Sequence, residues 1–128
     1  MSLKTALKTM IVDDMSVSRG LLSQCLEEIG LQNVEYEKSG QEAFARVSGN
    51  PVHLVISDYN MPGMNGLDLL EHLRANKPTQ QVGFILVTGT PTPDIIARGR
   101  ALGLNNLVKK PFTTASLKAS IEAVVGRL

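Results

Sequence analysis

The chain has 128 residues, of which 43% are hydrophobic and 20% charged, and these values are typical of one globular domain. Thirteen Lys and Arg residues against twelve Asp and Glu give a net charge of +1, which supplies no general attraction to nucleic acid or to a membrane surface. The apolar runs fall far short of the roughly 20 residues that span a bilayer, and the N-terminus lacks a secretory signal. A single cysteine, Cys25, cannot form an intramolecular disulfide, so we expect a cytoplasmic protein.

Short apolar runs predict the strands of a sheet. Continuous runs suit strands that are buried on both faces of a parallel sheet, and they occur at Met10–Val12, Leu54–Ile56, Phe84–Val87 and Leu107–Val108. A weaker run from Val34 to Lys38 alternates apolar and polar residues, as a half-exposed edge strand does.

Longer segments between these runs have apolar residues at helical spacing. The first predicted helix carries Val17, Leu21, Leu22, Cys25, Leu26 and Ile29, and Gly30 is a suitable terminator. Further helices are predicted from Gln41 to Val47, after Gly66, from Asp94 to Leu102, and along a stripe from Leu117 to Leu128. Thr92 and Pro93 are typical of an N-cap and a first helical residue.

Strands and helices alternate along the chain, and this alternation favours an α/β fold. We expect a doubly wound, five-stranded parallel sheet with right-handed crossovers and helices on both faces. The sequence contains no linker-like stretch that would separate two domains. Residues 1–128 are therefore interpreted as one domain without an appended output domain.

Polar side chains follow four of the predicted strands directly. They are Asp13, Asp14, Asp58, Thr88 and Lys110. Because ligands of open α/β sheets bind beyond the carboxyl ends of the strands, these side chains should meet at one edge. Taken singly, each has an ordinary structural explanation: Asp13, Asp14 or Ser16 as a helix cap, and Asp58 as a turn residue. Their common position at successive strand ends favours a shared site.

Three carboxylates at one edge repel each other unless protons or a cation neutralise them. The ligands are all oxygen, which favours a hard ion such as Mg²⁺, and Mn²⁺ can substitute. A carboxylate-bound Mg²⁺ beside a lysine can hold a phosphoryl group while a carboxylate attacks its phosphorus.

Four motifs, in this order, resemble the signature of the response-regulator receiver domain. They are Asp13-Asp14, the stretch from Asp58 to Gly66, Thr88-Gly89 and Lys110-Pro111-Phe112. The resemblance extends from about Lys8 to Leu128 and is closest to receivers of the stand-alone, CheY-like type. It implies the flavodoxin-like strand order 2-1-3-4-5, of which receivers of that type are themselves a known example.

The resemblance also implies residue roles. Asp58 matches the phosphoacceptor, and Lys110 and Thr88 match the residues that contact the phosphoryl group. Asp14, Asp58 and the backbone carbonyl of Asn60 match the Mg²⁺ ligands, with Asp13 binding directly or through water. The Lys110–Pro111 peptide bond matches one that is cis in this family.

The family likeness further implies a two-component signalling switch rather than an enzyme. A sensor histidine kinase or a histidine phosphotransfer protein would phosphorylate Asp58, and the phosphoryl group would change a partner-binding face. This output face comprises the fourth long helix, the fifth strand and the fifth long helix. Its candidate residues are Ile96, Arg100, Leu107, Lys109, Phe112 and Lys118.

Position 107 departs from the family pattern, because an aromatic residue usually stands three residues before the signature lysine and here the residue is Leu107. We therefore expect a smaller inward rearrangement on phosphorylation, or coupling through the helix at residues 94–102 alone.

Other functions compete with this interpretation. The receiver can act in chemotaxis, as a phosphate sink or as a step in a phosphorelay, and a receiver that binds partners without phosphorylation is a further possibility. An aspartate-nucleophile phosphohydrolase needs a second acid two residues after its nucleophile, where this chain has Asn60. A flavodoxin binds phosphate with its first loop, where Asp13 and Asp14 would repel it.

Overall fold

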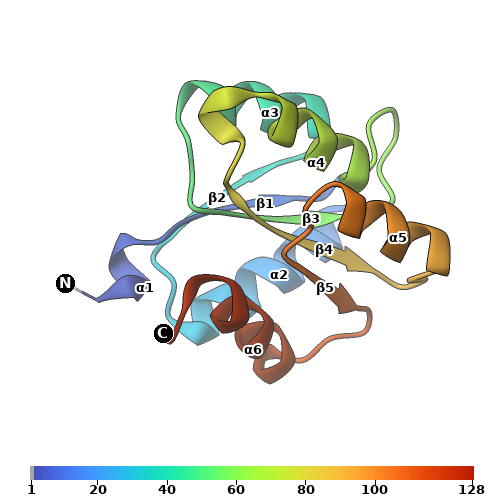
Figure 1. Ribbon diagram of the computed structural model, residues 1–128. Helices are drawn as coiled ribbons and strands as arrows, with labels where there is room; N and C mark the ends of the chain where they lie inside the picture. Colours follow the sequence, from blue (N-terminus) through green and yellow to red (C-terminus); the bar gives the residue numbers. More distant parts are fainter. Residues whose placement is uncertain (1) are drawn as a thin grey trace.

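Five parallel strands form the centre of the computed structural model, which describes residues 2–128. The strand order is β2-β1-β3-β4-β5, which confirms the flavodoxin-like fold (Figure 1). The strands are β1 (Lys8–Val12), β2 (Asn33–Glu37), β3 (Leu54–Asp58), β4 (Gly83–Thr88) and β5 (Asn106–Lys109). As expected, β2 is a partly exposed edge strand and β3 is buried along its whole length.

Helices cover both faces of the sheet. Those that follow the strands are α2 (Ser16–Ile29), α3 (Gly40–Gly49), α4 (Gly66–Ala75), α5 (Pro93–Ala101) and α6 (Thr114–Val125). Figure 1 shows α2 and α6 on one side of the sheet and α3, α4 and α5 on the other. Among the described residues, no helix has both the length and the apolar character required to cross a bilayer.

Successive residues of each strand belong to different core layers, because strand side chains alternate between the two faces. Met10 and Val12 of β1 pack in the layer beneath α3, α4 and α5, whereas Ile11 packs beneath α2 and α6. Phe84 and Ile85 of β4 divide in the same way. Burial on both faces explains why these strands are continuous apolar runs.

Two predicted helix boundaries are confirmed by their capping groups. Gly30 ends α2 in the left-handed region with φ 101°, a conformation that favours glycine. The Thr92 side chain accepts a hydrogen bond from the N–H of Ile95, and Pro93 is the first residue of α5.

Not all of the apolar residues at helical spacing in α2 face the sheet. Val17 is 73% exposed and Leu21 55% exposed, whereas Leu22, Leu26 and Ile29 are buried. Positions 17 and 21 lie one residue, or about 100° of helical rotation, away from the row at 22 and 26. Only the latter row faces the sheet.

Several segments differ from their predicted extents. The helix predicted from Gln41 to Val47 spans Gly40–Gly49, and Leu128 lies beyond the end of α6 while still packing against the core. Two short elements, α1 (Leu3–Ala6) and the 3₁₀ helix η1 (Lys77–Thr79), were not predicted. Both are shorter than the window over which helical periodicity is detectable.

Candidate functional site

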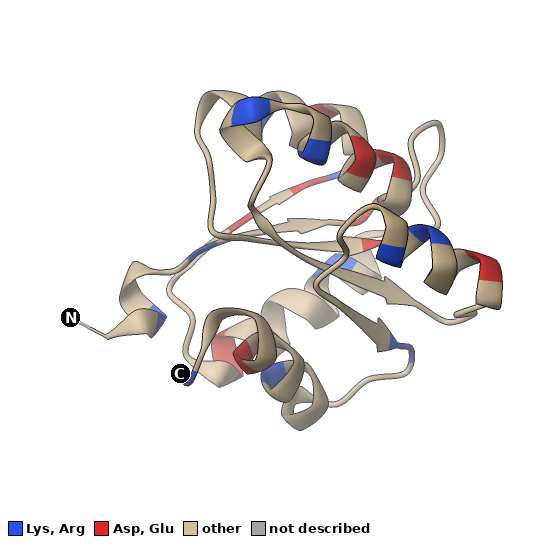
Figure 2. Cartoon of the chain, in the orientation of Figure 1, with Lys and Arg blue, Asp and Glu red and all other residues tan. Residues whose placement is uncertain are grey.

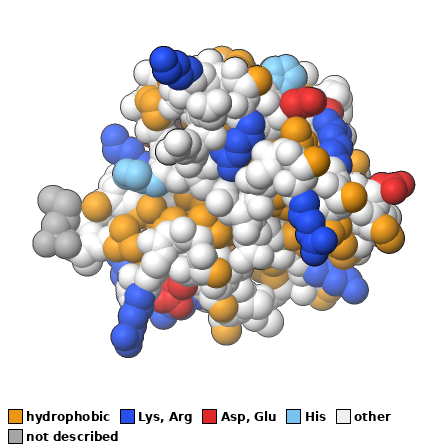
Figure 3. All heavy atoms as spheres, in the orientation of Figure 1, with side chains coloured by type: hydrophobic (Ala, Val, Ile, Leu, Met, Phe, Trp, Pro, Cys, Tyr) orange, Lys and Arg blue, Asp and Glu red, His pale blue; other side chains and the backbone are white. Residues whose placement is uncertain are grey.

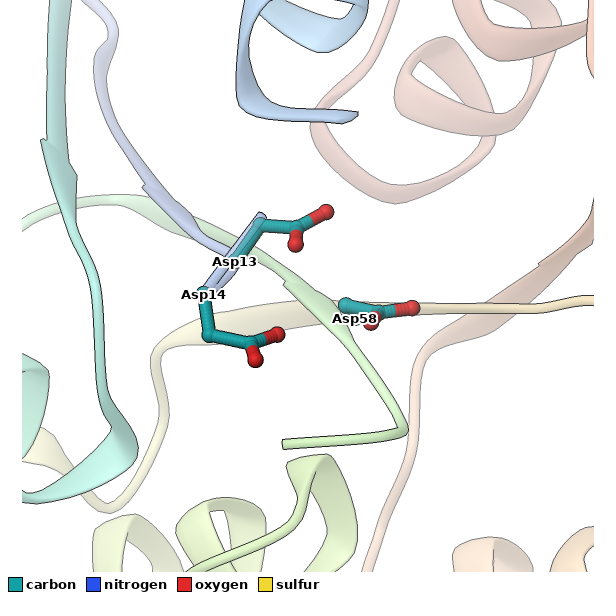
Figure 4. Close-up of side chains that lie close together, drawn as sticks. All are labelled: Asp13, Asp14 and Asp58. Carbon is teal, nitrogen blue, oxygen red and sulfur yellow. The ribbon is translucent and has the colours of Figure 1, made fainter. Parts of the chain in front are cut away.

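The parallel register brings the predicted site residues to one edge of the sheet. Val12 pairs with Ser57, Asp58 with Val87, and Thr88 with Lys109. The next residues along β1 and β5 are Asp13 and Lys110, so the strand ends lie side by side. Figure 4 shows the carboxylates of Asp13, Asp14 and Asp58 extending in the same direction from the ends of β1 and β3.

Asp13, Asp14 and Asp58 form a cluster that we call the acidic pocket. One carboxylate oxygen from each residue lies within 4.8 Å of the other two. Asp13 and Asp58 are buried and Asp14 is half-buried. Among residues 2–128, the buried oxygens without a hydrogen-bond partner include Oδ2 of Asp13 and Oδ1 of Asp14.

This geometry fits a divalent cation. A buried carboxylate oxygen without a partner loses its hydration and gains no hydrogen bond in return. Mutual repulsion adds to that cost, and a small hard cation held by oxygen ligands relieves both. The acidic pocket therefore has the donor set for Mg²⁺, independently of any family likeness.

Lys110 is the basic residue of this site. Its Nζ lies 2.9 Å from Oδ1 of Asp58. Burial raises the pKa of the Asp58 carboxyl above its usual range, the hydrogen bond and charge of Lys110 oppose this rise, and the charge of Asp13 adds to it. The Lys110–Pro111 peptide bond is cis, as predicted.

Thr88 is buried at the end of β4, beside the acidic pocket in the register. Its hydroxyl accepts a hydrogen bond from the N–H of Thr90 at 3.2 Å, and its carbonyl accepts one from the N–H of Lys110 at 2.9 Å. Next to it, a side chain at Gly89 would meet only the Cβ of Lys110, at 3.9 Å. Gly89 thus places no side chain beside Lys110.

The loop between β3 and α4 carries Asn60, which is exposed. It stands two residues after Asp58, where the predicted carbonyl ligand belongs. The role of its carbonyl oxygen stays a prediction.

The helix-cap interpretation of the first aspartates does not hold. Met15 is the N-cap of α2, and no side chain caps this terminus. Oδ1 of Asp13 accepts a hydrogen bond from the N–H of Met15 at 3.0 Å, outside the helix, and Ser16 is the first helical residue. The two carboxylates are thus directed to the pocket rather than into a helix.

Two further residues support the site and were not predicted. A Cβ at Gly66 would lie 2.6 Å from the carbonyl oxygen of Asp58, so only glycine allows α4 to begin this close to β3. Arg19 donates to the carbonyl of Asp13 at 3.0 Å and stacks on the ring of Tyr36 at 5.1 Å. Gly66 closes a motif visible in the sequence, whereas no local pattern indicates the contacts of Arg19.

The residues predicted for the output face differ in exposure and packing, and their role stays a prediction. Ile96 of α5 is 37% exposed and Lys109 is exposed. Leu107 is half-buried against the core layer beneath α3, α4 and α5, whereas Phe112 packs against the layer beneath α2 and α6. Figure 3, viewed with α5, β5 and α6 in front, shows scattered hydrophobic side chains between basic ones.

Comparison with known proteins identifies the family. Residues 9–122 match the family described as the response regulator receiver domain, which is most of the chain. The chain belongs to this family. Receiver domains of this CheY-like kind are phosphoacceptor signalling proteins rather than conventional enzymes, and the acidic pocket is the corresponding feature of this chain.

Individual receivers are similar over nearly their whole length. The sequence is 40% identical over 128 residues to the probable chemotaxis protein CheY of Rhizobium etli, covering 100% of this chain and 99% of that one. The fold matches Vibrio cholerae CheY4 with a TM-score of 0.85 at 28% identity, covering 92% of this chain and 98% of that chain. The receiver domain of the Pseudomonas aeruginosa sensor histidine kinase PA1611 matches with a TM-score of 0.85 at 20% identity, covering 94% and 98%. At that identity the last match shows the fold alone.

Proposed function

We propose that this receiver domain accepts a phosphoryl group on Asp58 in a Mg²⁺-dependent reaction and acts as a switch in a two-component system. The donor is a sensor histidine kinase or a histidine phosphotransfer protein. The observation that carries the proposal is the acidic pocket, in which one oxygen of Asp13 and one of Asp14 are buried without a hydrogen-bond partner, beside a lysine 2.9 Å from Asp58.

The proposed ligand set combines the acidic pocket with the carbonyl that the resemblance to receiver domains implies. Asp13, Asp14, Asp58 and the backbone carbonyl of Asn60 would hold the Mg²⁺, with Asp13 acting directly or through water. When bound, the ion neutralises phosphoryl oxygens and the carboxylates around them. A magnesium ion is coordinated in the active-site cleft of the PA1611 receiver domain, and the donor set of this chain suits the same ion.

Phosphoryl transfer then depends on three side chains. An Asp58 oxygen attacks phosphorus in line, the P–N bond of phosphohistidine breaks, and the imidazole leaves with the bonding electron pair. Lys110 moves from the Asp58 carboxylate to the new phosphoryl oxygens, and the Thr88 hydroxyl donates to them. Attack by water on the acyl phosphate later returns Asp58 to a carboxylate.

The phosphoryl group carries about −1.5 to −2 charges, by analogy with phosphorylated hydroxyls, in a site surrounded by buried groups. We infer that this charge shifts an equilibrium between two arrangements of α5 and β5 and so changes the face formed with α6. The output that we propose is the binding of another protein at this face.

Intact mass measurement after incubation with acetyl phosphate tests the proposal. The wild type should gain one phosphoryl group with Mg²⁺ and none with a chelator, because the carboxylates then repel the donor. Asp58→Asn should gain none under either condition. Asp94→Asn, at an exposed position of α5, is the matched control and should behave as the wild type.

Two outcomes would refute the proposal. One is phosphorylation that proceeds equally with a chelator, and the other is phosphorylation that persists in Asp58→Asn. Sustained release of phosphate from simple phosphate monoesters would instead favour a phosphohydrolase.

A further inference from the structure

The start of α4 is bonded to the loop that follows Asp58. The side chain of Asn65 accepts from the N–H of Asp68 at 2.8 Å, and Oδ2 of Asp68 accepts from the N–H of Asn65 at 3.0 Å. The N–H of Gly66 donates to the carbonyl of Tyr59 at 3.0 Å. Because α4 also begins against the carbonyl of Asp58, we expect a displacement of this loop to displace the capping box.

The second carboxylate oxygen of Asp68 binds a residue of α5. Oδ1 of Asp68 lies 2.9 Å from a terminal nitrogen of Arg98, and the same nitrogen lies 3.3 Å from Oε1 of Glu71. Figure 2 shows acidic positions on α4 and basic positions on α5 on the same side of the sheet. Asp68 therefore contacts the phosphoacceptor loop with one oxygen and α5 with the other.

Helix α5 has few buried residues. Its buried residues are Ile95 and Gly99. At the C-terminal end, a Cβ on Gly99 would lie 2.8 Å from the Leu104 side chain, and Arg74 donates to the carbonyl of Gly103 at 3.1 Å. We expect a helix with so few buried residues to respond to a change in its polar contacts.

We propose that Asp68 and Arg98 couple the acidic pocket to α5. This inference rests on the proposed function. When the pocket is occupied, the loop at residues 59–65 shifts and Asp68 moves with the capping box. The contact between Asp68 and Arg98 then transmits this movement to α5. The side chain of Leu107 has neither a polar group nor an aromatic ring that could provide a second connection between the pocket and α5. Arg98 is thus a positioning residue for the output helix, remote from the reacting atoms.

The test measures pocket occupancy and the α5 response separately. Beryllofluoride with Mg²⁺ is the probe, and ¹⁹F NMR reports whether it is bound in the pocket. Amide hydrogen exchange of residues 93–101 reports the response of α5. The variants are Arg98→Gln, Arg98→Lys, which keeps the charge, and Arg100→Gln, which removes an exposed charge from the same helix.

In the wild type, occupancy should change α5 exchange by about twofold to fivefold, the range that a partly exposed ion pair transmits. Arg98→Gln should bind the probe equally but lose this change, Arg98→Lys should restore most of it, and Arg100→Gln should keep it. Exchange in the β3 and β4 strands checks that each variant is folded.

The inference is overturned if Arg98→Gln binds the probe and retains the full α5 response, or if Arg100→Gln loses the response as well. A wild type that binds the probe without any change in α5 also overturns it. Failure of the wild type to bind the probe refutes the proposed function instead, so the two failures are distinguishable.

Discussion

The Nζ of Lys110 lies 2.9 Å from Oδ1 of Asp58, which pairs the only basic side chain we assign to the site with the proposed phosphoacceptor. In the unphosphorylated protein this contact opposes the rise in the Asp58 pKa that burial causes. After transfer, we expect the same ammonium group to contact the phosphoryl oxygens. The lysine would then serve both states of the carboxyl group.

Lys110→Ala should therefore slow phosphorylation of Asp58. Loss of one electrostatic group that stabilises a developing charge typically costs about 10²- to 10³-fold in rate. Phosphorylation by acetyl phosphate, followed by intact mass over time, measures this loss. Lys109→Ala, at the exposed neighbouring position, is the control, and an equal loss in both variants would contradict the assignment of Lys110.

Mg²⁺ should stabilise the folded protein through the acidic pocket. At a free concentration ten times its dissociation constant, a ligand specific for the native state adds about 1.4 kcal/mol. Urea unfolding with Mg²⁺ and with a chelator measures this gain, and Mn²⁺ should act in the same way.

Asp14→Asn should lose most of the Mg²⁺ dependence and, with a chelator, should be at least as stable as the wild type, because one repelling charge is gone. Asp94→Asn should retain the wild-type dependence. A full Mg²⁺ response in Asp14→Asn would show that the ion binds elsewhere.

Gly66→Ala should destabilise the fold and disturb the pocket. Its Cβ would lie 2.6 Å from the Asp58 carbonyl and 2.6 Å from Cδ1 of Leu86, and overpacking of this kind costs about 1–3 kcal/mol. Gly20→Ala is the matched control, since no atom lies within 4 Å of its Cβ, and it should raise stability by roughly 0.5–1 kcal/mol within α2. Denaturant unfolding compares the two; similar effects of both substitutions would contradict the close approach of α4 to β3.

The ion pair between Asp68 and Arg98 predicts a pH dependence of stability. Arg98 holds the pKa of Asp68 below its usual range, chiefly through its hydrogen bond. The stabilisation is present above the unfolded pKa of about 3.9 and is lost as pH falls through the lower folded pKa.

Arg98→Gln should accordingly be less stable than the wild type at pH 6, and the difference should shrink as pH falls below about 4. Urea unfolding across this range measures it, and added salt should reduce the difference at pH 6 because the pair is partly exposed. Arg100→Gln should show no such pH-dependent difference. A difference for Arg98→Gln that grows toward low pH would have the wrong sign.

The sheet and the pocket were predictable from sequence because each depends on local patterns. A strand buried on both faces appears in the sequence as a continuous apolar run, and the residue at the end of that run lies at the carboxyl edge of the sheet. Asp58 and Thr88 could therefore be placed at this edge from the sequence alone. The cap at Thr92 and the terminator at Gly30 depend on nearest neighbours alone.

Other features depend on how helices are placed relative to one another. The exposure of Val17 and Leu21 depends on which stripe of α2 faces the sheet, and both stripes are apolar. The contact of Asp68 with Arg98 joins residues 30 positions apart, and nothing in either local sequence specifies it. The family likeness to receiver domains supplied residue roles in the pocket but no information on this connection.

Chemical mapping of the phosphorylated residue tests the central claim most directly. Borohydride reduces an aspartyl phosphate to homoserine, which tandem mass spectrometry locates in a peptide. After treatment with acetyl phosphate and Mg²⁺, homoserine should appear at position 58 and nowhere else in the chain. Homoserine at position 13 or 14, or its absence from a protein whose mass shows a phosphoryl group, would contradict the assignment of Asp58 as the phosphoacceptor.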